Sequence, residues 1–385
     1  MKSKNFALNP DKDTLQQFDD CCKKDFVIKG ALMPDAHKGY VAPIGAVLVT
    51  KDYIVPAWVG YDIGCGVSAC EIKGTTLEKI RENEEKIYEE VKKNVPMGLG
   101  EIHSTKPPIS KETEKEFKKI IEKFKHGPHK KQLLQFLESK APRHLGTLGH
   151  GNHFIEIGYS EDKKPWIIVH SGSRGIGYKV AEFYMKKSAG NEKKFEETFP
   201  LHKDSELGKE YLNVLEFGLD FALLNRLEII KKTIESIEKI LGKKIEFELW
   251  TNKNHNHAIH EGEFFVHRKG ATPAKKGERG VIPGNMKEGS FLVEGLGNTD
   301  FLESSSHGAG RIYSRKEAKE KFSMKEFEEK MNGIKGTISE DTLDESPMAY
   351  KNIYNVMKAQ EQSVKIVKQI KPIINWKGEK HKKIN

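Results

Sequence analysis

A carboxylate and a thiol lie three residues apart in the glycine-rich segment 60–66, as Asp62 and Cys65. The segments 54–59 and 67–72 on either side are apolar and rich in β-branched residues, so we expect a loop between two strands. The glycines would let the backbone turn both side chains to the same side. Such a spacing suits a metal site, although the loop alone favours a buried free cysteine in a tight turn.

Three histidines, His153, His170 and His255, lie at the ends of predicted strands. Side chains at strand ends can converge from distant parts of a sheet, so these imidazoles could meet Asp62 and Cys65. One Asp, one Cys and three His exceed a single tetrahedral site with an open position, but they suit two ions that share a ligand. A single histidine is more often a hydrogen-bonded core residue, so the predicted two-metal centre depends on all five residues together.

Two further segments place small residues between a histidine and an arginine four positions later. They run from His170 to Arg174 and from His307 to Arg311. Exposed backbone N–H groups could cradle a phosphate there, and the arginine could clamp it. A glycine-rich turn needed only for packing is an equal alternative for either segment alone. Neither segment is a P-loop, because the sequence contains no G-x-x-x-x-G-K-[ST].

Composition and charge narrow the class of protein. The 385-residue chain carries 65 basic and 56 acidic side chains, a net charge of +9, which favours polyanionic partners without identifying nucleic acid. Its apolar segments are shorter than a membrane helix and its N-terminus lacks an apolar signal region, so we expect a cytoplasmic protein with no membrane partner. The four cysteines form no C-x-x-C pair, which also suits a reducing compartment.

Short apolar segments alternate with amphipathic helices, a pattern typical of the α/β or α+β class. At this length we expect one elaborated domain or two. An apolar stripe over 207–241 predicts one or two long helices that belong to the core. The polar segment 33–40 predicts a loop that contains Asp35. Further predicted elements are strands at 42–49, 154–157, 166–169 and 245–250, helices at 77–95, 112–125, 316–331 and 352–370, and a loop region over 270–289.

Seven motifs of the chain together resemble the RtcB family of RNA ligases, in that family's order. They are the segments 33–39, 62–66, 151–156, 170–175, 255–256, 267–271 and 306–311. Lys377 and Gly378 resemble the family's C-terminal lysine-glycine, so the resemblance covers nearly the whole chain. It implies a single domain over 1–385 with a mixed sheet core and peripheral helical insertions near 77–140 and 207–241. The chain resembles a short and somewhat divergent member.

The resemblance implies a GTP- and Mn²⁺-dependent ligase for RNA repair or tRNA splicing. Its substrates would be RNA with a 2′,3′-cyclic phosphate or 3′-phosphate and RNA with a 5′-hydroxyl. His307 would take GMP from GTP, the GMP would pass to the 3′-phosphate as an activated RNA end, and the 5′-hydroxyl would displace it. Ligand softness alone favours Zn²⁺ or another late transition metal, whereas the family implies two Mn²⁺. The resemblance leaves open an activating protein partner.

The resemblance also implies residue roles around the metals. Cys65 would bridge two ions, with Asp62 and His153 on one and His170 and His255 on the other. Asp35 would orient His307, the nucleophile. Phosphate or RNA would contact Arg174 and Arg311.

Nucleotide contacts follow from the same motifs. Glu156 would accept from the N–H groups of guanine. The other residues expected to bind GTP are Asn152, Asn285, Ser290, His307, Gly308, Gly310 and Lys377. The segment 284–288 reads Gly-Asn-Met-Lys-Glu where the family has Gly-Ser-Met-Gly-Thr, so Asn285 replaces a serine that contacts the triphosphate.

Two rival functions stand beside the ligase. The first is a metal-dependent cyclic phosphodiesterase that opens cyclic phosphates without ligation, which the same ligands would serve. The second is a catalytically impaired RNA-binding homologue, which the basic charge and the altered 284–288 segment favour. Transfer of GMP to His307 separates the ligase from both.

Overall fold

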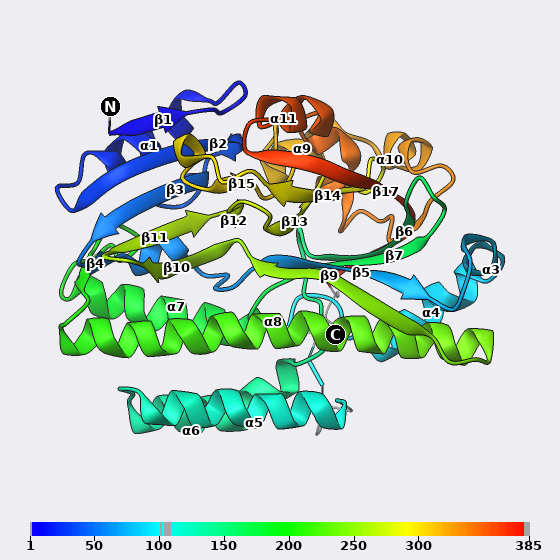
Figure 1. Cartoon of the computed structure of the whole chain (residues 1–385), viewed down its shortest axis with the longest axis horizontal. Helices are drawn as coiled ribbons and strands as arrows, with labels where there is room; N and C mark the ends of the chain where they lie inside the picture. Colours follow the sequence, from blue (N-terminus) through cyan, green and yellow to red (C-terminus); the bar gives the residue numbers. More distant parts are fainter. Residues whose placement is uncertain (1, 101, 104–108, 381–385) are drawn as a thin grey trace.

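The described residues of this computed structural model, 2–100, 102–103 and 109–380, build two large β-sheets flanked by helices (Figure 1). The five-stranded sheet has the order β1 (Ser3–Asn5), β2 (Val27–His37), β3 (Ile44–Lys51), β11 (Phe264–Lys269), β10 (Asn256–Glu261). The eight-stranded sheet has the order β13 (Arg279–Pro283), β14 (Ser290–Gly295), β17 (Val364–Lys377), β6 (Phe154–Tyr159), β7 (Pro165–Ser171), β5 (Gly66–Lys73), β9 (Glu246–Asn254), and β16 (Lys335–Gly336) pairs with β17.

Two short strand pairs complete the β structure. They are β4 (Tyr53–Ile54) with β8 (Leu201–His202), and β12 (Ala271–Pro273) with β15 (Ser304–Ser306). Most neighbouring strands are antiparallel, whereas β1 with β2 and β16 with β17 are parallel. The sheets are therefore mixed, and the expected α/β (α+β) single domain is confirmed.

Helix α8 (Glu206–Leu241) is one continuous helix of 36 residues that packs along the eight-stranded sheet (Figure 1). The Ser205 side chain accepts a hydrogen bond from the Gly208 N–H at 3.0 Å, which caps the first turn. Gly242 takes a left-handed conformation directly after the helix, where glycine has no Cβ penalty. The apolar stripe of α8 is buried, so the predicted core role of 207–241 is confirmed.

Other helices surround this layer. Helix α7 (Arg174–Ala189) lies beside α8, and α5 (Lys111–His126) and α6 (Lys131–Lys140) lie on the side of α8 away from the sheet (Figure 1). The remaining α-helices are α1 (Lys12–Cys22), α2 (Pro56–Val59), α3 (Leu77–Glu82), α4 (Glu84–Asn94), α9 (Arg315–Lys321), α10 (Met324–Lys330) and α11 (Ile353–Ala359). Among the described helices, none combines the length and the apolar character needed to cross a membrane. Residues 101 and 104–108 of the expected insertion near 77–140 lie outside the described residues.

Several element predictions were wrong, and the sequence explains the main ones. The segment 33–40 is not a loop, because β2 continues to His37; the β2–β3 register is interrupted between Leu32 and His37, and Asp35 lies in that irregularity. The segment 54–59 is not a strand, because Pro56 starts helix α2, where its missing N–H costs nothing.

The third error concerns the segment 352–370, which is not one helix. It divides into α11 and strand β17, and the β-branched residues Val364, Ile366 and Val367 favour the strand. The predicted loop region 270–289 likewise contains strands β12 and β13. The predicted helix 77–95 divides into α3 and α4, and the predicted helix 316–331 divides into α9 and α10 because Ser323 caps a new helix. The predicted strands at 42–49, 67–72, 154–157, 166–169 and 245–250 correspond to β3, β5, β6, β7 and β9.

Candidate metal centre and active site

Ends of strands from both large sheets surround a cavity of about 860 Å³. The predicted site residues that line it are Asp62, Cys65, Asn152, Glu156, His170, His255, Asn285, Ser290, His307, Gly308, Gly310, Arg311 and Lys377. The other three, Asp35, His153 and Arg174, lie behind this lining and contact it or one another. The structure therefore brings together all the residues that the sequence motifs suggested.

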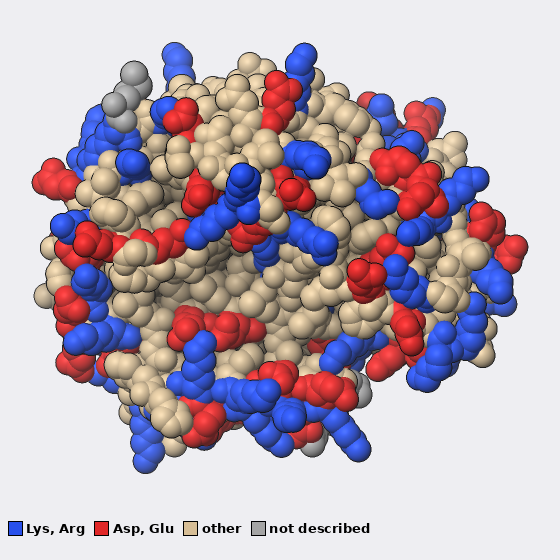
Figure 2. All heavy atoms as spheres, in the orientation of Figure 1, with Lys and Arg blue, Asp and Glu red and all other residues tan. Residues whose placement is uncertain are grey.

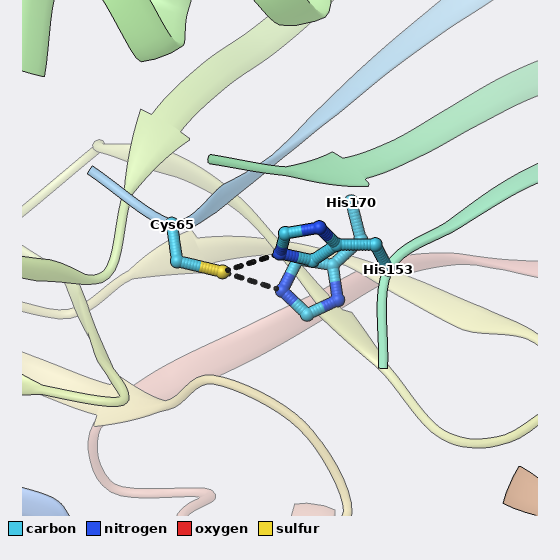
Figure 3. Close-up of side chains that lie close together, drawn as sticks. All are labelled: Cys65, His153 and His170. Carbon is cyan, nitrogen blue, oxygen red and sulfur yellow. Dashed lines mark hydrogen bonds between the residues drawn. The ribbon is translucent and has the colours of Figure 1, made fainter. Parts of the chain in front are cut away.

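A thiol and two imidazoles meet at one end of the cavity (Figure 3). The Cys65 Sγ atom lies 3.4 Å from His153 Nε2 and 3.2 Å from His170 Nε2. Cys65 directly precedes β5, His153 directly precedes β6 and His170 lies near the end of β7, so three adjacent strands supply the cluster. All three side chains are buried, and their ligand atoms lie within 4.8 Å of one another, a geometry that could hold a metal ion.

Backbone carbonyls orient both imidazoles. His153 Nδ1 lies 3.0 Å from the Leu148 carbonyl oxygen and His170 Nδ1 lies 3.1 Å from that of Asn152. Because a carbonyl only accepts, each Nδ1 carries the hydrogen and each Nε2 directs a lone pair toward Cys65. The Arg174 Nη1 atom approaches His153 Nδ1 at 3.3 Å, but it cannot donate to a nitrogen that is itself a donor. This is the arrangement of metal-binding histidines.

Two more ligand atoms extend the cluster in opposite directions. Asp62 Oδ2 lies 2.9 Å from His153 Nε2, and His255 Nε2 lies 3.3 Å from His170 Nε2. With Nδ1 of His153 protonated, the Asp62–His153 contact joins two acceptor atoms, a separation that requires a proton or a cation between them. The donor set therefore fits divalent cations, with oxygen, nitrogen and sulfur ligands available.

His307 lies beside this cluster and is held by Asp35. The rings of His307 and His255 are 4.8 Å apart between centroids. Asp35 Oδ2 lies 2.7 Å from His307 Nδ1 and accepts the backbone N–H groups of His307 and Gly308, each at 3.2 Å. Burial alone would raise the pKa of Asp35, but the charge and hydrogen bonding of His307 outweigh it and lower that pKa. Asp35 is thus an ionised anchor for Nδ1, and Nε2 of His307 remains free to react.

Two glycines allow this close packing. A Cβ at Gly270, where φ is +62°, would lie 3.1 Å from ring atoms of His307. A Cβ at Gly310, where φ is +76°, would lie 2.1 Å from the Asp35 carbonyl oxygen. Packing therefore explains the glycine at position 310, whether or not GTP contacts it.

Another part of the cavity lining buries a carboxyl group, Glu156. Its oxygens lie 3.5 Å from Ser290 Oγ and 3.2 Å from Asn375 Nδ2. Burial raises the pKa of Glu156 to about 8, against an ordinary value of 4.5, because few charges compensate the carboxylate. A guanine base that donates N–H groups would supply such compensation.

Glu345 gathers several charges around Lys377, and no sequence motif pointed to it. Its carboxylate lies 2.9 Å from Lys377 Nζ and 3.3 Å from Arg311 Nη1, and it also pairs with Arg315. The Tyr350 hydroxyl donates to it at 2.5 Å. Burial would raise the pKa of Glu345, but the charges of these cations outweigh it and hold that pKa below its ordinary value. Glu345 thus fixes two of the predicted site residues, Lys377 and Arg311.

The Asn285 side chain closes its own turn at the cavity wall. Its Oδ1 accepts the backbone N–H groups of Lys287 and Glu288 at 2.9 and 3.0 Å, and its Nδ2 donates to Glu288 Oε2 at 2.8 Å. These bonds use the Asn285 carbonyl oxygen and one of its two amide N–H groups. The substitution in the 284–288 segment therefore has a local structural role.

The fold and the site define a mixed α/β protein in which a candidate metal cluster adjoins a carboxylate-held histidine. Residues 17–378 match a family model described as tRNA-splicing ligase RtcB, so the chain belongs to the RtcB family and the resemblance is confirmed. It is 34% identical over 394 residues to the RNA-splicing ligase RtcB of Escherichia coli (strain K12), covering 95% of this chain and 94% of that protein. It is 30% identical over 426 residues to the tRNA-splicing ligase RtcB of Nanoarchaeum equitans (strain Kin4-M), covering 90% and 87%. These coverages give this chain nearly the length of the E. coli relative.

Proposed function

We propose that this protein is a GTP-dependent RNA ligase. It would join RNA that ends in a 2′,3′-cyclic phosphate or 3′-phosphate to RNA that begins with a 5′-hydroxyl, in RNA repair or tRNA splicing. The observation that carries the proposal is His307, held by Asp35 at 2.7 Å beside the Cys65 cluster, in the cavity that also contains Glu156. Membership of the RtcB family supports the ligase class.

The first step is transfer of GMP to His307. Asp35 holds Nδ1, so Nε2 attacks the α-phosphorus of GTP; an N–P bond forms, the P–O bond to the β-phosphate breaks, and pyrophosphate leaves. Glu156 accepts from guanine N–H groups, with Ser290 and Asn152 nearby, and Lys377 and the 308–310 segment complete the nucleotide site. Arg311 contributes charge near the phosphates.

The later steps act on RNA. Water opens a cyclic phosphate to a 3′-phosphate, whose oxygen then attacks the phosphorus of the His307 adduct and frees the imidazole. The 5′-hydroxyl attacks the activated 3′-phosphate, and GMP leaves as the new phosphodiester forms. Arg174, at the start of α7 and beside His153, would hold an RNA phosphate.

Asp62, Cys65, His153, His170 and His255 would hold two divalent cations, with Cys65 shared. Bound there, the cations would offset negative charge on the reacting phosphoryl oxygens. We assign Mn²⁺ from family membership, although a thiolate and imidazoles also suit Zn²⁺. Restoring GMP transfer to metal-free protein with each ion tests this assignment, and restoration by Zn²⁺ alone would overturn it.

A joining assay tests the proposal. RNA with a 3′-phosphate and RNA with a 5′-hydroxyl are incubated with the protein, GTP and Mn²⁺, and the products are resolved by length. We expect joined RNA that requires GTP, with no product from 3′-hydroxyl ends. Opening of a cyclic phosphate without joined RNA would instead identify a phosphodiesterase, and RNA binding without either reaction would identify an impaired homologue.

A further inference from the structure

Charge alone does not mark a path for RNA on this molecule. Figure 2 shows lysines and arginines interspersed with aspartates and glutamates on one face of the protein, without a field of one sign. Single-stranded nucleic acid is also recognised by aromatic rings on which bases stack, independently of a strongly basic surface. Exposed aromatic side chains that adjoin the cavity are therefore the features that could bind RNA.

Three tyrosines form a ladder at the cavity mouth. The rings of Tyr61 and Tyr178 are stacked, with centroids 4.6 Å apart and an interplanar angle of 15°. The Tyr40 ring lies perpendicular to Tyr61, with centroids 5.9 Å apart. Tyr40 is 77% exposed and Tyr178 is 49% exposed, so both present ring surface to solvent. Such exposure is costly for aromatic rings unless something covers them.

The ladder is continuous with the candidate active site. Tyr61 directly precedes Asp62, and Tyr40 lies in the short connection between β2, which carries Asp35, and β3. Tyr40 and Tyr61 line the same cavity as Cys65 and His307. A polymer whose end reaches His307 could therefore pass over Tyr40.

The ladder is also fixed in place. The Tyr61 hydroxyl donates to the Glu196 carboxylate, and Tyr178 belongs to helix α7. The neighbouring Lys38 pairs with Asp13 at 2.5 Å, so the charges next to Tyr40 compensate each other. A rigid aromatic surface with compensated charge suits the face of a base better than a phosphate.

We propose that Tyr40, supported by the Tyr61–Tyr178 pair, is a stacking site for an unpaired base of the RNA strand whose end lies in the cavity. The proposal rests on the proposed function in taking RNA as the ligand. The site recognises the π-face of a base, so it tolerates any sequence and excludes a paired end.

Binding of RNA in the absence of GTP tests the site without any chemistry. A short, fluorescently labelled single-stranded RNA with a 5′-hydroxyl and a 3′-phosphate is titrated with protein, and anisotropy gives Kd. Tyr40→Ala should weaken binding about tenfold, whereas Tyr40→Phe, which keeps the ring, should bind like wild type. Tyr354→Ala, at an exposed tyrosine outside the cavity lining, is the matched control and should have no effect.

An abasic scan locates the base. Removing one base of the RNA at a time should weaken wild-type binding about tenfold at one position and leave Tyr40→Ala binding unchanged at that position. The salt dependence of Kd should be the same for wild type and Tyr40→Ala, because no phosphate contact is lost. Equal Kd values for Tyr40→Ala and wild type would overturn the stacking site. Failure of RNA joining with the Tyr40 effect intact would overturn the ligase alone.

Discussion

Two regions of the cavity, the Cys65 cluster and the Glu345 network, differ in how their charges are balanced. At the metal end, burial lowers the pKa of His170 and raises that of Cys65, so neutral imidazoles and a thiol face one another. At the other end, Glu345 is ionised and surrounded by Lys377, Arg311, Arg315 and the Tyr350 hydroxyl. In the first region lone pairs of the cluster face one another, and the charges of the buried Arg226 and Lys269 act on Cys65 without separating those lone pairs. The second region is compensated without any ligand.

The two regions therefore differ in how far their structure depends on a bound ligand. A cation bound at the Cys65 cluster would balance its charge, so the order of the cluster should depend on metal. The Glu345 network is complete in the protein itself, so it can hold Lys377 and Arg311 ready before a nucleotide arrives. The predictions below separate these two behaviours.

Loss of the shared thiol should have the largest effect. Cys65→Ala should lose bound metal and lower RNA joining by at least about a hundredfold, because a bridging ligand is removed from both ions. Metal content after dialysis, measured by mass spectrometry, and the joining rate check this outcome. Cys70→Ala, at a buried free cysteine in strand β5 and outside the cavity lining, is the control and should keep its metal. Wild-type metal content in Cys65→Ala would refute the bridging role.

Neutralising Glu345 should have a smaller effect, confined to the nucleotide end. Glu345→Gln should raise KM for GTP about tenfold and lower the free energy of unfolding by about 3 kcal/mol, because buried cations lose their counter-charge. Metal content should not change. Glu326→Gln, an exposed cap of α10, is the control. An unchanged KM for GTP would show that Glu345 does not position Lys377 and Arg311.

The smallest effect concerns pH. Because the pKa of Glu156 is raised from 4.5 to about 8, the folded protein keeps a proton that the unfolded chain releases. The stability contribution of the protonated form is therefore present below about pH 4.5 and is lost as pH rises through about 8. Denaturant unfolding should show a steeper fall in stability between these values for wild type than for Glu156→Gln. Identical slopes would mean that Glu156 ionises normally.

Much of the fold and site could be predicted from local sequence. Strands β5, β6 and β7 are rich in apolar residues, whereas the first half of β9 alternates them with glutamates. Cys65, His153, His170 and His255 lie at or next to the ends of these strands. Because these strands are neighbours in one sheet, residues at their ends had to lie close together.

Other features depend on contacts that no local pattern encodes. Glu345 lies in a short 3-10 turn, and its burial arises only where strand β17 brings Lys377 beside the segment 311–315. Asp35 looked like a loop residue because Pro34 and Asp35 favour turns. Strand pairing on both sides of it, at Leu32 with β1 and β3 and at His37 with β3, keeps the segment within β2. In both cases contacts between segments far apart in the sequence, rather than local residue preferences, determine where the side chain lies.

Formation of a protein-GMP adduct tests the central claim most directly. Protein is incubated with α-labelled GTP and Mn²⁺ without RNA, and the label that stays with denatured protein is measured before and after acid treatment. We expect an acid-labile adduct in wild type and in His260→Ala, at an exposed histidine outside the cavity lining, and none in His307→Ala. Label retained in His307→Ala, or no label in metal-loaded wild type, would contradict the account.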